Sequence, residues 1–248
     1  MEVNEILQMN KESWEKSAER FFGRAALPEY GPLAPREDQL NLLGNISNKT
    51  VLDIGCGSGH SLKYMAINGA RELWGLDLST KQIETATSLL HDQPVPVSLF
   101  ESAMEEDPGL PENYFDIVYS VYAIGWTWDL KQTFSNISCY LKKDGIFIFS
   151  WEHPIHDRLS YKDSEYIFQK SYVKEGPELN EAWNNTAVTY QRKFSTYINT
   201  LIETGFSVEK IIDDVVLPES ITDDPAKWYS AQKAQLVPAT FIVKAKKR

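Results

Sequence analysis

The sequence predicts an α/β protein with a mostly parallel sheet, and three observations carry this prediction. Residues 51–54 form a short apolar run interrupted only by Asp53, typical of a buried strand, and a glycine-rich turn leads from it into a helical pattern that begins at Leu62. A second short strand at 72–76 ends in another acidic residue, Asp77. Strands and helices continue to alternate after it, which is the order in which crossover helices connect parallel strands.

Length and composition fit one domain with one core. The 248 residues are 42% hydrophobic, enough to bury a substantial core and an inserted segment. The net charge of −10 argues against a surface that binds nucleic-acid phosphates. We expect the basic run at 244–248 to be the solvated end of the last strand rather than a nucleic-acid tail.

Cysteine content and hydropathy indicate the cellular compartment. Cys56 and Cys139 stand far apart without metal-ligand spacing, so neither a metal site nor a disulfide scaffold is expected. The polar N-terminus lacks the pattern of a signal peptide, and no apolar run approaches the length of a membrane helix, roughly 18 residues. We therefore expect a soluble cytoplasmic protein with no nucleic-acid or membrane partner.

Residues 1–34 are expected to form a helical cap ahead of the main domain. Apolar side chains recur at helical spacing through 4–22, so one face of this helix is apolar. Such a helix can simply cover the sheet, or it can close over a bound ligand, and the pattern leaves both open. Pro35 then starts a second helix that Gly44 ends, and the main domain is expected to span 35–248.

The spacing of the glycines after the first strand indicates a family. The dinucleotide-binding fingerprint is G-x-G-x-x-G, but here Gly59 comes one residue early and His60 stands where the third glycine would be. The order Asp53-x-Gly55-x-Gly57-x-Gly59 instead resembles the first motif of the class I S-adenosylmethionine-dependent methyltransferases of the small-molecule type. The resemblance implies a Rossmann-like, doubly wound sheet of seven strands, mostly parallel with an antiparallel last strand. It also implies S-adenosylmethionine as the cofactor, with its methionine part against the glycine loop.

Asp77 is the second specific signal. It lies 22 residues past Gly55, at the end of the second strand, where nucleoside-binding α/β proteins place an acidic side chain that accepts hydrogen bonds from the ribose hydroxyls. A lone Asp after a strand can also cap a helix. Here Ser79 and Gln82 already supply a capping box for the next helix, so we expect the ribose role.

The segment after the third strand, 95–100, is expected to hold the adenine. Ser102, Ala103 and Met104 stand where the family binds the base, but Ser102 replaces the Asp that many members carry, and Met104 could equally be core filler. The predicted cofactor-binding residues are Asp53, Gly55, Cys56, Gly57, Gly59, Asp77, Leu78, Gln82, Ser102, Ala103, Met104 and Ser120.

The ends of the fourth and fifth strands are expected to face the acceptor. An aromatic-rich loop follows the fourth strand, 115–119, and either lines the reaction pocket or packs in the core. The fifth strand, 146–150, is followed by Glu152 and His153, both placed for proton transfer. We expect His153 to be the catalytic residue; the alternative is that it only bonds a loop carbonyl.

Regular alternation stops at 155–191, which is expected to be an inserted lid of paired strands with Tyr172, Trp183 and Tyr190 as apolar walls. Helices at 195–203 and near 226–235 and strands at 207–212 and 240–245 complete the chain. The predicted substrate-binding residues are Tyr30, Tyr122, Trp126, Tyr190 and Arg192.

These expectations amount to methyl transfer from S-adenosylmethionine to a small-molecule acceptor. Two alternatives stay open: methylation of RNA or protein, and binding of the cofactor without catalysis. The sequence does not indicate which atom of the acceptor is methylated, whether a general base is used, or the oligomeric state.

Overall fold

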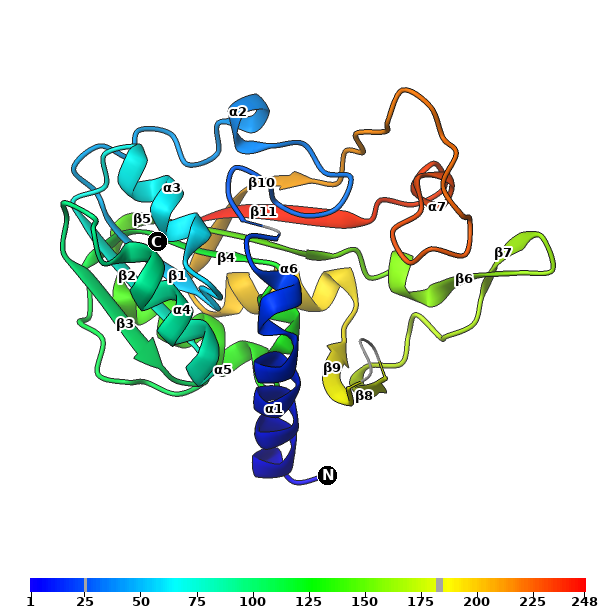
Figure 1. The fold of residues 1–248 in the computed structure, drawn as a ribbon, viewed down its shortest axis with the longest axis horizontal. Helices are drawn as coiled ribbons and strands as arrows, with labels where there is room; N and C mark the ends of the chain where they lie inside the picture. Colours follow the sequence, from blue (N-terminus) through cyan, green and yellow to red (C-terminus); the bar gives the residue numbers. More distant parts are fainter. Residues whose placement is uncertain (25, 182–184) are drawn as a thin grey trace.

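The computed structural model describes residues 1–24, 26–181 and 185–248, and contains one central sheet of seven strands (Figure 1). The strand order is β10-β11-β5-β4-β1-β2-β3, and β11 runs antiparallel to both of its neighbours. This is the predicted Rossmann-like sheet. Trp183, expected to be a wall of the insertion, lies outside the described residues.

The parallel half of the sheet follows the predicted order closely. Its five strands are β1 Thr50–Ile54, β2 Glu72–Asp77, β3 Val97–Glu101, β4 Phe115–Val121 and β5 Leu141–Glu152. The helices that connect or cover them are α3 His60–Ile67, α4 Thr80–Leu90, α5 Leu130–Tyr140 and α6 Phe194–Glu203. The antiparallel pair is β10 Phe206–Ile212 and β11 Thr240–Lys247.

Alternation along the central strands separates two apolar layers, one on each face of the sheet. Phe147 and Phe149 of β5 pack with α5 and α6, whereas Ile148 between them packs in the second cluster with Leu62 and Met65 of α3. Because successive side chains of a strand point to opposite faces, both faces are covered and the sheet is doubly wound. All five residues of β1 are buried, so the glycine turn that follows it starts from a fixed position.

The N-terminal helix α1, Val3–Phe21, forms as expected, but the second helix is much shorter than predicted. Instead of running to Gly44, α2 spans only Glu37–Leu40. The carboxylate of Glu37 accepts the backbone N–H groups of Leu42 (3.0 Å) and Leu43 (2.8 Å), and Asn41 adopts the left-handed conformation that ends the helix.

The insertion after β5 consists of two antiparallel hairpins outside the main sheet, as its alternating pattern predicted. One joins β6 Leu159–Lys162 to β7 Glu165–Phe168, and the other joins β8 Gly176–Asn180 to β9 Ala187–Gln191. In Figure 1 the first projects away from the sheet and the second lies beside α1.

The last predicted helix is also shorter than expected, since α7 spans only Ala231–Ala234. The Ser230 hydroxyl accepts the N–H groups of Gln232 and Lys233 and so caps the helix, which excludes the preceding residues from it.

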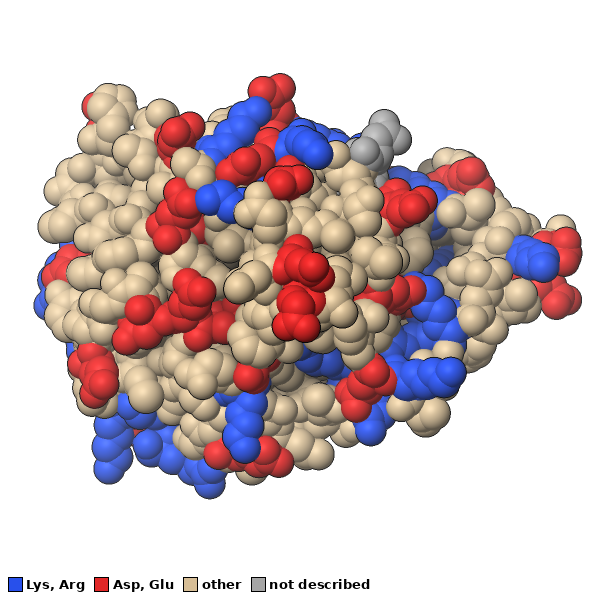
Figure 2. All heavy atoms as spheres, turned by 90° about the horizontal axis from the view of Figure 1, so that it is seen from below, with Lys and Arg blue, Asp and Glu red and all other residues tan. Residues whose placement is uncertain are grey.

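Within the described ranges, no helix is long and apolar enough to cross a membrane. The face in Figure 2 shows acidic and basic side chains interspersed rather than gathered into a continuous basic stripe.

Candidate functional site

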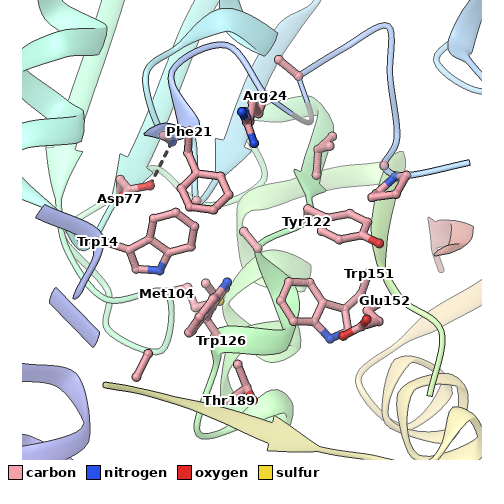
Figure 3. A pocket seen from close by; sticks show the side chains of 18 of the residues that line it. Trp14, Phe21, Arg24, Asp77, Met104, Tyr122, Trp126, Trp151, Glu152 and Thr189 are labelled. Atoms are coloured by element: carbon pink, nitrogen blue, oxygen red, sulfur yellow. Dashed lines mark hydrogen bonds between the residues drawn. The ribbon is translucent and has the colours of Figure 1, made fainter. Parts of the chain in front are cut away.

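A cavity of about 920 Å³ opens at the carboxyl edge of the parallel strands, where open α/β sheets bind ligands. Its walls come from the loop after β1, the ends of β2, β4 and β5, the helix α1 and the hairpin strand β9. Figure 3 shows the side chains that converge on it.

The glycine loop turns tightly beneath one end of this cavity. Gly55 and Gly57 have φ values of 76° and 51°, a region that glycine enters at little cost. At Gly55 a Cβ would also lie 2.3 Å from the Cβ of Ala123, so a larger residue would not fit. The backbone N–H groups of Gly55 and Cys56 both donate to the carbonyl of Leu76, which ties the turn to β2.

Asp77 fixes this loop to the start of the next helix. One oxygen of its carboxylate accepts the N–H of Gly57 and the other that of Ser79, each at 2.9 Å, and Figure 3 shows the side chain reaching the loop. Burial raises the pKa of Asp77, while these backbone donors oppose the rise. Ser79 caps α4 as expected by accepting the N–H of Gln82 (3.3 Å).

Most of the predicted cofactor-binding residues line the cavity. They are Asp53, Gly55, Cys56, Gly57, Asp77, Leu78, Gln82, Ser102, Ala103 and Met104. Gly59 and Ser120 do not, and both expectations need correction. Gly59 is the N-cap residue that precedes α3, and its missing side chain lets Ala86 and Leu90 of α4 approach. The hydroxyl of Ser120 donates to the carbonyl of Ile54 (2.8 Å) and joins β4 to β1.

The predicted acceptor residues divide in the same way. Tyr122, Trp126, Tyr190 and Arg192 line the cavity. Tyr30 does not: it is 1% exposed, and its hydroxyl donates to Glu37 (2.8 Å) within the core.

The structure also places His153 away from the cavity lining. Its Nδ1 accepts the N–H of Ile155 (3.3 Å), and its ring packs against Phe194 and Phe241. Burial lowers its pKa, which keeps the ring neutral. His153 therefore supports the local turn, close to the structural alternative foreseen for it, and the structure does not bring it into the cavity lining as expected.

The adjacent Glu152 lines the cavity instead, beside Trp151 (Figure 3). Its carboxylate accepts the indole N–H of Trp228 (2.5 Å) and faces Nδ1 of His156 at 3.3 Å. Burial, followed by the charge of Asp157, raises the pKa of Glu152 to about 8. A carboxyl group with such a pKa can exchange a proton near neutral pH.

An aromatic wall lines the cavity between Asp77 and Glu152 (Figure 3). The rings of Trp14 and Trp126 are 5.2 Å apart at their centroids, and those of Trp126 and Trp151 are 6.2 Å apart. Tyr122 meets Trp151 at 5.4 Å. The predicted aromatic loop thus contributes Trp126 to the pocket.

Trp128, which belongs to the aromatic-rich loop after β4, and Tyr172, an expected wall of the insertion, are not in the lining. Trp128 donates its backbone N–H to Glu105, and the Tyr172 hydroxyl accepts the N–H of Phe194. Conversely, sequence reasoning missed Trp14, Trp151, Arg158 and Tyr229 as lining residues. The helical spacing of Trp14 and the position of Trp151 after a strand were the available signals.

Helix α1 and the hairpin strand β9 are joined across the cavity. The side-chain amide of Asn10 donates to the carbonyl of Val188 (2.9 Å), and its oxygen accepts the N–H of the same residue (2.7 Å). Asn10 is 3% exposed, so both bonds are shielded from water. The helix and the insertion therefore cover the cavity together.

Comparison with known proteins gives this site a chemistry. The model of a family described as "Methyltransferase domain" matches residues 52–149. The chain is 29% identical to an uncharacterised protein of Haemophilus influenzae over 84% of its own length and 85% of the relative's. It is 28% identical to a ubiquinone biosynthesis O-methyltransferase of Chromobacterium violaceum, covering 60% of this chain and 62% of that protein.

A shorter match, 40% identical, joins 32% of this chain to 24% of a tRNA U34 carboxymethyltransferase of Shewanella sediminis. Among solved structures, a putative S-adenosylmethionine-dependent methyltransferase from Listeria monocytogenes superposes with a TM-score of 0.71 at 26% identity, covering 86% of this chain and 97% of the other.

The family match covers the strands and turns that build the cofactor end of the cavity, and the superposition on the Listeria structure extends over most of the chain. Both agree with the motif read from the glycine spacing. The chain belongs to the class I S-adenosylmethionine-dependent methyltransferases and is an enzyme that uses S-adenosylmethionine as its cofactor.

Proposed function

We propose that the enzyme transfers the methyl group to a small-molecule acceptor, enclosed between the aromatic wall and the insertion. The observation that carries this proposal is that the paired bonds of Asn10 to Val188 join α1 to β9, two elements that both line the cavity. A cavity of about 920 Å³ lies within the usual range of small-molecule sites, roughly 300–1,000 Å³. A covered site of this size suits a cofactor and a small acceptor better than a polymer.

The residues at the glycine loop fit S-adenosylmethionine. Where a Cβ would stand on Gly57 there is no atom within 4 Å, so the backbone is open to a ligand. Asp77 lines the same space, and its two oxygens keep lone pairs beyond the two backbone bonds, which ribose hydroxyls would use. The buried Oε1 of Gln82 has no hydrogen-bond partner among the described residues and would accept from the cofactor.

The adenine is proposed to lie against Leu78, Ala103 and Met104, which supply apolar surface. Ser102 contributes less than its position predicts. Its N–H donates to the carbonyl of Asp77, and its hydroxyl is directed to the carbonyl of Ala103 (3.1 Å). Recognition of the base at this point therefore rests on shape.

When bound, the cofactor supplies a methyl group activated by an adjacent sulfonium, and the protein's task is alignment in a closed pocket. The rings of Trp14, Trp126 and Trp151 exclude water from the acceptor's side of the cavity. Glu152, held by Trp228, is proposed to take the proton that an O–H or N–H acceptor must lose.

RNA or protein substrates are less well supported. The net charge of −10 opposes binding of a phosphate backbone, and the described face in Figure 2 offers no basic stripe. The tRNA-acting relative matches over only 24% of its own length.

A labelled-methyl assay tests the proposal. The enzyme is incubated with S-adenosylmethionine carrying a labelled methyl group and a deproteinised extract below the size of oligonucleotides, and products are found by mass shift. Label in a small product supports the proposal. Label only in added tRNA or protein would overturn it, and binding of S-adenosylhomocysteine without any transfer would support the non-catalytic alternative.

A further inference from the structure

Two buried arginines line the cavity from the insertion and the strand that ends it, rather than from the glycine loop. Arg158 follows β5 in the insertion and is 2% exposed; Arg192 follows β9 and is 7% exposed. Both line the cavity. A guanidinium group remains charged at any physiological pH, and a buried charge without partners costs several kcal/mol.

Neither arginine uses all of its N–H groups in hydrogen bonds within the described residues. Nη1 of Arg158 is bonded to Asp157 (3.1 Å) and to the side chain of Gln191, but its Nε and Nη2 have no partner among the described residues. Nη2 of Arg192 donates to the carbonyl of Thr127 (2.5 Å), and Nη1 has no partner in the same set. No carboxylate of the described chain lies within ion-pair distance of Arg192.

The surrounding residues hold the two groups in place. Arg192 lies over the ring of Tyr190, 5.0 Å from its centroid, and Arg158 lies over the ring of Tyr172 at 5.8 Å. Both arginines act on the phenol of Tyr197, which also lines the cavity. Burial raises the pKa of Tyr197, while the charge of Arg192, a hydrogen bond from Arg192 and the charge of Arg158 oppose the rise. The arginines therefore converge on one place.

The acidic residues of the cavity do not account for the spare donors. Glu105 accepts from the Thr127 hydroxyl and the Trp128 N–H, and Asp77 accepts from the backbone. Asp157 already pairs with Arg158 and also with Lys170 (3.5 Å). Nε and Nη2 of Arg158 and Nη1 of Arg192 are therefore buried donors without a partner among the described residues.

We propose that Arg158 and Arg192 bind an anionic group of the acceptor, a carboxylate or a phosphate, so that the substrate is a small anion. The fork of a guanidinium group matches both oxyanions, and the buried position makes such a contact strong. The inference rests on the proposed small-molecule function and specifies its substrate class. It assigns these arginines to the acceptor and not to the cofactor, whose proposed site lies at the glycine loop.

Binding of three matched probes to the enzyme loaded with S-adenosylhomocysteine tests this at constant ionic strength. Benzoate carries a carboxylate, phenyl phosphate a phosphate, and benzamide has the size of benzoate without its charge. We expect at least one anion to bind about tenfold or more tightly than benzamide, measured by calorimetry. The preferred anion distinguishes a carboxylate acceptor from a phosphorylated one.

Arg192→Met should reduce anion binding to the level of benzamide and leave the affinity for S-adenosylhomocysteine unchanged. Arg158→Lys keeps the positive charge beside Asp157 and should weaken anion binding less than Arg192→Met does. Arg36→Met is the matched control, since Arg36 lines the same cavity but is half exposed and already paired with Glu29 (3.3 Å). This control should bind the anions as the unmodified enzyme does.

Equal binding of all three probes, or no binding of either anion, would overturn the inference. So would an Arg192→Met enzyme that loses S-adenosylhomocysteine, because the arginine would then serve the cofactor. Failure of the unmodified enzyme to bind S-adenosylhomocysteine would instead count against the cofactor site on which the proposed function depends, so the two failures are distinguishable.

Discussion

The two ends of the cavity are built on different principles. At the glycine loop, polar side chains are tied to backbone groups of the sheet: Asp77 to Gly57 and Ser79, and Ser120 to Ile54. At the opposite end, Glu152 and the arginines project from the end of β5 and from an insertion outside the sheet. A site that is fixed by the fold suits a cofactor common to many enzymes, whereas side chains on an insertion can differ with the acceptor.

Glu152→Gln gives the largest expected effect on this comparison. Loss of a positioned proton acceptor should lower the single-turnover rate about 100-fold or more, while the affinity for S-adenosylhomocysteine stays the same. Rates from single-turnover experiments and affinities from calorimetry check both parts. An equal loss of cofactor affinity would show that the two ends are not independent.

The pH profile sharpens the same point. Burial and the charge of Asp157 raise the pKa of Glu152 to about 8, while Lys233 and Lys170 oppose the rise, so Glu152 is mostly protonated at pH 7. The single-turnover rate of methyl transfer should therefore rise as pH increases through 8. His156 also faces this group but stays neutral, since burial lowers its pKa to about 3. The Gln variant should lack the rise. A rise that survives in it would assign the proton to another group.

Stability should show the opposite trend with pH. Because the pKa of Glu152 is higher in the folded state than the usual carboxyl value, folded protein holds a proton that unfolded protein has lost between those two values. The free energy of unfolding should therefore fall as pH rises toward 8. Chemical denaturation of the Gln variant should give a flatter dependence; identical slopes would contradict the raised pKa.

At the other end, Asp77→Ala should weaken binding of the cofactor at least about tenfold, since each lost charge-assisted bond to the ribose is worth about 1.5–3 kcal/mol. Asp77→Asn keeps the shape of the side chain but loses its charge, so its affinity for the cofactor is expected to lie between those of the unmodified enzyme and the Ala variant. Calorimetry with S-adenosylhomocysteine measures the effect, and circular dichroism confirms folding. Unchanged affinity in a folded Ala variant would remove Asp77 from the cofactor site.

Asn10→Ala should moderately destabilise the cover that α1 and β9 form over the cavity. The variant loses two buried hydrogen bonds to Val188, each worth roughly 1 kcal/mol. Hydrogen exchange in β8 and β9 should speed up in the free enzyme, and in the unmodified protein it should slow when cofactor and acceptor are bound. Exchange that is slow and ligand-independent in both proteins would make the hairpin a fixed structural element.

His153→Gln should give the smallest effect, less than about twofold on kcat, because its ring lies outside the cavity lining. Loss of its packing against Phe194 should instead lower the melting temperature. This variant is the control for Glu152→Gln, one residue away on the same strand end. A large loss of turnover at unchanged stability would restore His153 to the reaction.

The cofactor end could be predicted from the sequence because its determinants are local. Asp53 to Gly59 is one continuous motif, and Asp77 and Ser79 act within a few residues of each other. Local patterns of this kind survive in the fold because β1 and β2 are buried neighbours.

The acceptor end depends on contacts that no short pattern records. Asn10 and Val188 are 178 positions apart in the sequence, and Arg158 was not distinguished from a surface arginine. Tyr30 was expected at the acceptor because no local pattern shows that its hydroxyl bonds to Glu37 in the core. Glu152 and His153 are adjacent, so only the fold shows which of them reaches the cavity.

The bonding of Asn10 has a consequence for the order of events in turnover. One side chain satisfies both the donor and the acceptor of Val188, so separating α1 from β9 breaks the two bonds in the same motion. A partial separation would leave the buried amide of Asn10 and the backbone of Val188 without hydrogen-bond partners. We therefore expect the cover formed by α1 and β9 to have two states, closed and open. Since α1 and β9 both line the cavity, we expect release of the methylated product and exchange of S-adenosylhomocysteine to share one slow step, the opening of this cover. The steady-state rate would then measure the opening of the cover, and the single-turnover rate the chemical step.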